Sequence, residues 1–156
     1  MKRWSYSIQL ADEALVAKAV ARDLPLSVKR LVNLARAIKG MRLEEARSFL
    51  ELVAAGKQPV PHWRYKGKTA HHRGVSERWG VPQAKYPVKA ARLLLKLLRN
   101  LEANAENKDL DLSRLRIIHV GVHKSYTLKR YMPRAFGRST PKYKRHSHVE
   151  IVAVEA

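Results

Sequence analysis

The segment from Leu112 to Val149 contains ten Lys or Arg residues and no Asp or Glu. Its positive charges repel one another, and it offers few apolar side chains that a protein core could bury. Such a segment has little to gain from packing against its own chain. It therefore predicts contact with a polyanion, and nucleic acid is the most direct candidate.

Two apolar runs, residues 115–124 and 147–155, lie at the ends of this basic segment and predict two antiparallel strands. The register that matches their apolar side chains pairs Ile118 with Ala153, Val120 with Ile151, and Val122 with Val149. A slip of one residue would place these side chains on opposite faces, so the register is well constrained. The strands would end near Lys124 and Ser147. Residues 125–146 would then form a finger that turns between Ala135 and Phe136 and reaches on the order of 35 Å from the body.

Three helices are predicted before the hairpin. The first follows the N-cap Ser27 and runs to Lys39, the second covers residues 42–54, and the third runs from Pro87 to about Asn107. A weak alternation over residues 3–10 predicts a short strand. Together the elements predict an α+β fold, a small body of three helices packed on a short antiparallel sheet, with a long extended β-hairpin. We expect a single domain over residues 1–156, with the hairpin over residues 115–155 and its tip near residues 131–138.

Residues 57–86 form a basic-aromatic insertion that breaks both helical and strand periodicity. The insertion holds seven Lys or Arg residues and a single acid, Glu77. Its Trp63 and Trp79 could stack on RNA bases or could anchor the loop to the body. Anchoring is the favoured interpretation, because so long a loop needs contacts that hold it.

The whole chain is basic, since 32 Lys or Arg residues against 13 Asp or Glu residues give a formal net charge of +19. Such a charge indicates the nature of the partners rather than the fold. No cysteine is present, which excludes disulfides and cysteine-based metal sites. No stretch approaches the roughly 18 apolar residues of a membrane span. We therefore expect a cytoplasmic protein without a membrane partner.

Catalysis and metal binding find little support. No clustered carboxylates lie beside the basic regions, where a nuclease would need them to hold Mg²⁺. No glycine-rich phosphate loop or nucleophile motif is present. His119 and His123 would stand four strand residues apart, about 13 Å, which is too far for one ion. We expect no enzymatic activity, no cofactor and no metal site.

Several short motifs, taken together, are similar to those of one known family. In chain order they are Ser27-Val28-Lys29, residues 37–41, Glu45-Ala46, residues 86–91, residues 102–105 and residues 131–141. The tip Met-Pro-Arg-Ala-Phe-Gly-Arg at residues 132–138 is the most specific of them. In these motifs the chain resembles the ribosomal protein L-twenty-two family of the large subunit, which is called L-seventeen in eukaryotes. The insertion at residues 57–86 looks like that of the archaeal and eukaryotic branch.

The resemblance implies a body on the outer face of the large subunit and a hairpin that threads into its rRNA, with the tip lining the peptide exit tunnel. The implied partners are large-subunit rRNA, neighbouring ribosomal proteins and the nascent peptide, without a homo-oligomer. The implied tunnel-lining residues are Met132, Pro133, Arg134, Ala135, Phe136, Gly137 and Arg138. The residues expected to bind RNA are Lys29, Arg36, Lys39, Lys66, Lys68, Arg73, Lys85, Lys89, Lys124, Lys129, Arg130, Arg134, Arg138, Lys142, Lys144 and Arg145.

Two other functions compete with this one. A free architectural nucleic-acid-binding protein would need a dimer seam or a recognition helix, and the sequence has no clear sign of either. An RNA-processing enzyme is disfavoured by the missing carboxylate cluster. The structural, rRNA-binding ribosomal protein is therefore the leading hypothesis.

Overall fold

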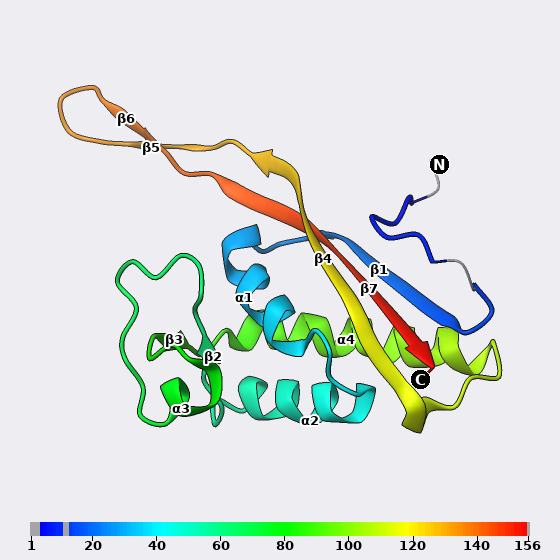
Figure 1. Ribbon diagram of the computed structural model, residues 1–156. Helices are drawn as coiled ribbons and strands as arrows, with labels where there is room; N and C mark the ends of the chain where they lie inside the picture. The colour runs from blue at the N-terminus through cyan, green and yellow to red at the C-terminus, as the bar shows by residue number, and fades with distance from the viewer. Residues whose placement is uncertain (1–3, 11–12, 156) are drawn as a thin grey trace.

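The computed structural model describes residues 4–10 and 13–155. Its helices lie against one face of a three-stranded antiparallel sheet, and a long hairpin projects beyond the body (Figure 1). In this sheet β7 (Lys144–Glu155) lies between β1 (Val16–Leu24) and β4 (Leu115–Leu128). The other elements are α1 (Val28–Ile38), α2 (Leu43–Ala54), β2 (Val60–Pro61), α3 (Val75–Trp79), β3 (Ala84–Lys85), α4 (Val88–Glu106), a 3₁₀ turn (Leu112–Arg114), β5 (Tyr131–Pro133) and β6 (Ser139–Pro141).

The predicted α+β class and the long hairpin are confirmed, and the helix count differs by one. The helices expected around residues 27–39, 42–54 and 87–107 are α1, α2 and α4. The additional helix among the described residues, α3, spans only five residues inside the insertion. So short a segment, between Gly74 and Gly80, carries no apolar periodicity that could reveal it.

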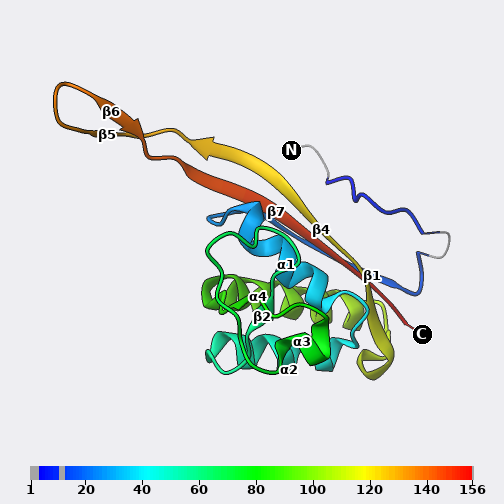
Figure 2. The same cartoon turned by 60° about the vertical axis from the view of Figure 1, so that its left-hand side comes forward.

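The helices cover the sheet with one continuous core, as Figure 2 shows from a second direction. Leu34 of α1, Leu50 of α2 and Leu94 of α4 are fully buried in it, together with Ile151 of β7. Truncating a leucine at such a site typically costs about 2–5 kcal/mol. These contacts fix the body from which the hairpin extends.

The predicted hairpin register is confirmed at two of its three pairs. Val120 lies opposite Ile151, and Val122 lies opposite Val149. The pairing of Ile118 with Ala153 is wrong, because Ile117 takes that place and the register shifts between Ile117 and His119. Ile117 is held there by the link between α1 and α2: its carbonyl accepts from the Gly40 amide at 2.7 Å, and its own amide donates to the Met41 carbonyl at 2.9 Å. These two backbone bonds orient Ile117 so that its side chain lies in the core.

The strands extend further into the finger than the sequence predicts. They were expected to end near Lys124 and Ser147, whereas β4 continues to Leu128 and β7 begins at Lys144. A second shift of register between Lys124 and Thr127 adds one residue to the first arm. This bulge moves the turn from between Ala135 and Phe136 to Phe136 and Gly137.

The first strand lies elsewhere than predicted. The described part of the expected strand, residues 4–10, adopts no strand, and residue 3 lies outside the described residues. The strand that pairs with the other edge of β7, opposite β4, is β1, and it was not predicted. Its sequence lacks strict alternation, because Val16, Ala17 and Ala19 are buried while Lys18 between the last two is half-buried.

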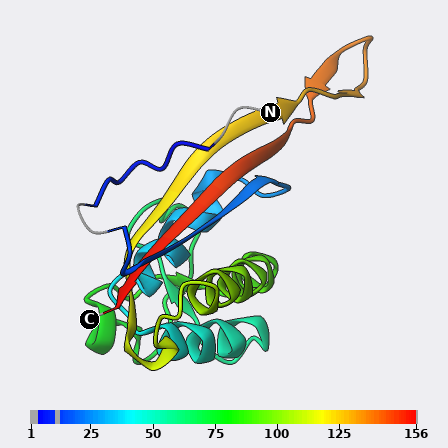
Figure 3. The ribbon, with the colours of Figure 1, turned by 90° about the vertical axis from the view of Figure 1, so that its right-hand side faces the viewer.

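Residues 4–10, the N-terminal strap, instead run across the face of the sheet opposite the helices (Figure 3). The strap is tied to Glu150, a fully buried carboxylate in β7. The Trp4 indole Nε1 donates to Glu150 Oε2 at 2.8 Å, and the Ser7 amide donates to Oε1 at 3.1 Å. The Ser7 hydroxyl also donates to this carboxylate. On the sheet side, Nε2 of His119 and Nε2 of His123 each lie 3.3 Å from Oε1.

A glycine makes room for this buried carboxylate. A Cβ added at Gly121 would lie 2.6 Å from Glu150 Oε1 and 2.8 Å from His123 Nε2. Both distances are shorter than real contacts allow. Any side chain at position 121 would therefore displace Glu150 and the strap that depends on it.

Hydrogen bonding keeps Glu150 ionised although it is buried. Burial alone would raise the pKa of the carboxyl group, but bonds from the Ser7 hydroxyl, the Trp4 indole and the Ser7 amide outweigh it. The resulting pKa falls from 4.5 to about 2. The charged form is thus the form that the strap recognises.

We predict that Glu150→Gln releases the N-terminal strap. Hydrogen bonds to a charged acceptor are worth roughly 2 kcal/mol, and a neutral amide accepts more weakly. Because the folded-state pKa is depressed, this stabilisation is present above pH 4.5 and is lost as the pH falls toward about 2. Amide exchange at Ser7 measures it: wild type should lose protection in that pH window, and Glu150→Gln should lack protection throughout.

Glu155→Gln is the matched control, since the ion pair that the Glu155 side chain forms within residues 4–10 and 13–155 is with surface Arg114, at 3.8 Å. It should leave the Ser7 amide as protected as in wild type. Equal protection of Ser7 in the Glu150 variant would contradict the role assigned to the buried carboxylate.

Candidate nucleic-acid interface

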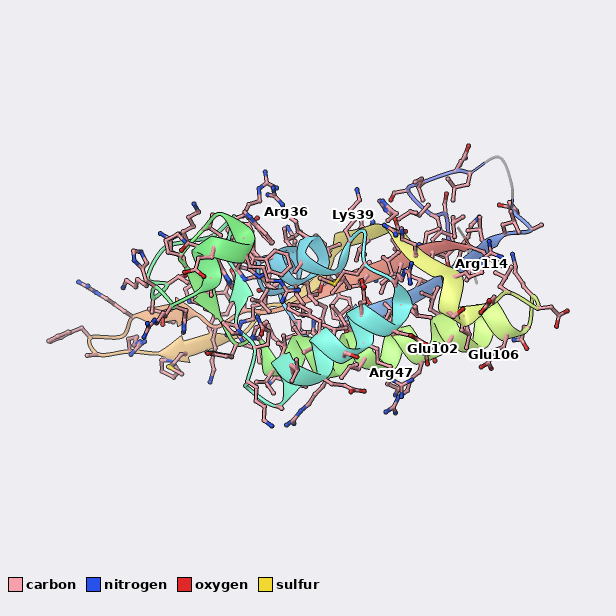
Figure 4. All side chains as sticks on the ribbon, turned by 60° about the horizontal axis from the view of Figure 1, so that its bottom comes forward. Arg36, Lys39, Arg47, Glu102, Glu106 and Arg114 are labelled. Carbon is pink, nitrogen blue, oxygen red and sulfur yellow. The ribbon has the colours of Figure 1, made fainter. Side chains whose placement is uncertain are left out.

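Every lysine and arginine that the sequence predicts to bind RNA has an exposed side chain. In the described part of the chain, the ion pairs of Lys and Arg are formed instead by Lys18, Arg47 and Arg114. Arg47, for example, lies 3.3 Å from Glu51 and 3.5 Å from Glu102, across α2 and α4 (Figure 4). An exposed cation that has no carboxylate partner is available for phosphate.

The structure brings some of these cations together and leaves others apart. Lys29 and Lys85 line one cavity, of about 480 Å³, between α1, β3 and the start of α4. Lys89 lines a second, of about 280 Å³, with Lys144 and Arg145 from the base of the finger. Arg130, Lys142 and Lys144 line a third cavity, of about 560 Å³, along the arms of the finger. The predicted cations that line none of the three are Arg36, Lys39, Lys66, Lys68, Arg73, Lys124, Lys129, Arg134 and Arg138.

Sequence reasoning missed Arg30, which lines the first two of these cavities. It follows Lys29 in the first turn of α1, so its side chain projects in a different direction around the helix. The signal that could have revealed it is its position next to the Ser27-Val28-Lys29 motif. The helix turns the two neighbouring cations toward separate parts of one surface.

The basic-aromatic insertion is anchored by its tryptophans, as the sequence predicts. The Trp79 ring lies 5.7 Å from that of Trp63 and 6.1 Å from that of Phe49 in α2. Buried Asn33 of α1 adds two hydrogen bonds, because its side chain accepts from the Arg64 amide at 3.1 Å and donates to the Arg64 carbonyl at 2.9 Å.

One predicted RNA-binding cation is also placed by this anchor. The Arg36 guanidinium stacks over Trp63, 4.7 Å from the centre of its ring. Arg36 of α1 and Lys39, the C-cap residue of that helix, project on the same side of the molecule (Figure 4). The insertion therefore positions cations of the helix as well as its own.

The tip of the finger places an aromatic side chain in solvent. Phe136 and Gly137 adopt φ values of +57° and +68°, the pattern of a type I′ turn. This backbone suits glycine but costs energy for a phenylalanine. The Phe136 side chain is 97% exposed, so burial within this chain does not repay the strain.

The histidines of the hairpin contact a buried carboxylate and an aromatic ring. His119 and His123 converge on Glu150, although their strand spacing is wide. His146 is buried and stacks on Tyr126 with ring centres 4.5 Å apart. Among residues 4–10 and 13–155, no group of three or more His, Asp or Glu is arranged to hold a metal ion. Within the same residues, no helix is both long and apolar enough to cross a membrane.

Comparison with known proteins gives consistent matches over nearly the full length. A family model described as "Ribosomal protein L22p/L17e" matches residues 19–154. The chain is 56% identical over 155 residues to the "Large ribosomal subunit protein uL22" of Hyperthermus butylicus and equally to that of Aeropyrum pernix, with 99% of both chains covered in each case. It is 47% identical over 153 residues to the protein of the same name from Archaeoglobus fulgidus, with 98% of this chain and 97% of the relative covered.

We predict that the finger of the isolated protein exchanges its amide hydrogens rapidly. Residues 128–145 are all exposed, and a two-stranded ribbon without a packed face is marginal in water. Hydrogen exchange should show weak protection over residues 129–143 and strong protection at Ile151, which is fully buried. Added RNA should slow exchange in the finger. A finger as protected as Ile151 in the absence of RNA would contradict this prediction.

Proposed function

This chain belongs to the ribosomal protein L22p/L17e family, and on that premise we propose that it is a structural constituent of the large ribosomal subunit. It has no catalytic role and works in the cytoplasmic ribosome. Its basic finger and the adjoining body bind large-subunit rRNA and support assembly. The finger tip lines the tunnel through which the nascent peptide leaves. Neighbouring ribosomal proteins contact the body, and a single copy acts in each subunit.

The observation that carries this proposal is the set of exposed cations along the finger and around its base. They have no carboxylate partners in the described residues, and the formal net charge of the chain is +19. Charges of one sign at such density repel one another until a polyanion compensates them. Binding to rRNA releases the counterions condensed on its phosphates, which supplies the driving force.

The tip has a different chemistry from the arms, and this supports a different role for it. Between Arg134 and Arg138 the chain presents Ala135, Phe136 and Gly137 without further charge. The fully exposed Phe136 gains nothing from phosphate but can line a passage. Phosphate contacts along the arms supply position and affinity, whereas the tip residues shape the wall of the tunnel.

We predict that removing five finger cations flattens the salt dependence of RNA binding. Each phosphate contact adds roughly 0.7–0.9 to the slope of log affinity against log salt, so five lost contacts should lower the slope by roughly four. Titration of a labelled rRNA fragment at several salt concentrations measures it. The residues to replace by Gln are Lys129, Arg130, Lys142, Lys144 and Arg145.

A matched pair of single variants provides the control. Arg130→Gln and Arg47→Gln each remove one positive charge, but Arg47 is already paired with Glu51 and Glu102. Only Arg130→Gln should lower the slope. If the five-site variant binds with an unchanged slope, the finger is not the main electrostatic contact.

We predict that Phe136→Asn alters the tunnel without impairing assembly. Asn tolerates the positive φ of the turn, so the hairpin should form at least as well. Cells that carry only this variant should contain normal numbers of large subunits but show a changed pattern of ribosome pausing. The five-site Gln variant should instead lower the number of large subunits. If cells with Phe136→Asn lose large subunits, the tip is an assembly anchor instead. If the protein sediments apart from large subunits, a free architectural nucleic-acid-binding protein is favoured.

A further inference from the structure

Three cavities adjoin one another from the base of the finger to the start of α4. The first, about 560 Å³, lies along the arms of the finger and shares Tyr143 and Lys144 with the second, of about 280 Å³. The second shares Ser27 and Arg30 with the third, of about 480 Å³. The second cavity thus shares lining residues with both of the others, so the three adjoin in a row, here called one depression, across the finger, α1 and the insertion.

The electrostatics of this depression are of a single sign. Among the described residues no Asp or Glu lines it, and each cavity is lined by at least three Lys or Arg side chains. Arg130, Lys142 and Lys144 stand at the finger end, and Lys29, Arg30 and Lys85 stand at the other. An anion that follows the depression meets a cation along its whole length.

Exposed tyrosines stand at both ends of the depression. Tyr131 and Tyr143 form an edge-to-face pair with ring centres 6.1 Å apart, and their side chains are 60% and 42% exposed. At the far end Tyr65 and Tyr86 are 45% and 42% exposed. Lys29 already lies over the Tyr65 ring, 5.2 Å from its centre, and all four rings remain partly exposed beside the cations. Exposed aromatic rings interleaved with cations are the arrangement on which unpaired bases stack.

The far end also holds polar groups with unused hydrogen-bonding capacity. The His62 side chain is only 6% exposed; its Nδ1 lies 3.1 Å from the Val60 carbonyl, and within the described residues its Nε2 has no partner. Ser27 is the N-cap of α1, yet its side chain makes no capping bond. Tyr65 adopts a φ of +59°, which is costly for an aromatic residue. A buried imidazole, a free hydroxyl and a strained aromatic thus converge on one cavity.

We propose that this depression, the strand track, binds a single strand of RNA whose phosphates lie on the cations and whose bases stack on the tyrosines at its two ends. The proposal rests on the proposed function, because it specifies which form of rRNA the body and the finger base accept. His62 and Ser27 then offer hydrogen bonds to a base edge or a ribose hydroxyl. Burial lowers the pKa of His62, which keeps the ring neutral and able to accept or donate.

The aromatic residues distinguish a single strand from other polyanions. In a duplex the bases are stacked inside the helix and cannot reach Tyr65 or Tyr143, so a duplex would contact the cations alone. An acidic peptide would likewise use the charges and leave the rings idle. Only an unpaired strand engages both sets of residues.

The experiment measures binding of the full chain to a labelled single-stranded oligouridylate and to a blunt RNA duplex of the same length. The test variant carries Tyr→Leu at positions 65, 86, 131 and 143, which leaves every charge in place. Because base stacking on the rings is lost, affinity for the single strand should fall at least about tenfold. The salt slope should stay unchanged because the phosphate contacts remain.

Two further variants make the result specific. Tyr→Phe at the same four positions keeps the rings and should restore binding. Tyr126→Leu removes a tyrosine that is 52% exposed but lies outside all three cavities, and it should bind as wild type does. Circular dichroism of each variant confirms that the body is folded.

The outcomes separate this proposal from the proposed function. If the Tyr→Leu variant binds the single strand as tightly as wild type, or if polyglutamate displaces the strand as well as unlabelled RNA does, the strand track is overturned while rRNA binding by the finger stands. If wild type binds the duplex more tightly than the single strand, the track is also overturned. If wild type binds neither RNA in a salt-dependent way, the proposed function itself fails.

Discussion

The antiparallel pairing of β4 with β7 is the interaction on which the rest of the structure depends. β7 is the central strand of the sheet, and its Val149, Ile151 and Ala153 are fully buried beneath the helices. The same two strands leave the core and become the arms of the finger. The packing of the body therefore fixes the direction in which the cations are presented, and a slip in register would disturb core and finger together.

Charge is distributed so that the body does not neutralise its own binding surface. Carboxylates gather on α2 and around the end of α4, where Glu102 pairs with Arg47 and Asp111 caps the following turn. The finger contains no carboxylate at all. Hydrophobic burial in the body must therefore offset the repulsion among finger cations, and the extended hairpin lessens that repulsion by spacing the charges along its length.

The sequence predicts the parts of this molecule that follow simple periodicity. A buried face makes apolar residues recur at a regular spacing in the sequence. That spacing predicts the apolar stripes of α1, α2 and α4, and it predicts the pairs Val120–Ile151 and Val122–Val149. β1 was missed because its burial does not alternate. The strap and the proposed strand track depend on residues far apart in the chain, such as Trp4 with Glu150, and no local pattern records such contacts.

Preorganisation differs between the two halves of the basic surface, and this determines what each contributes. Around Arg36 and Lys29 the cations are held before any RNA arrives, since Trp63 and Tyr65 stack under them and Asn33 ties the insertion to α1. Little conformational entropy is lost there on binding, so contacts at the body translate more fully into affinity. Along the finger, side-chain contacts such as the bond from Arg134 Nε to Thr140 Oγ1 at 3.2 Å are local and exposed, so this segment loses more entropy when it becomes ordered. Under the proposed function, the body is thus suited to bind rRNA first, and the finger, whose direction β4 and β7 fix, to follow.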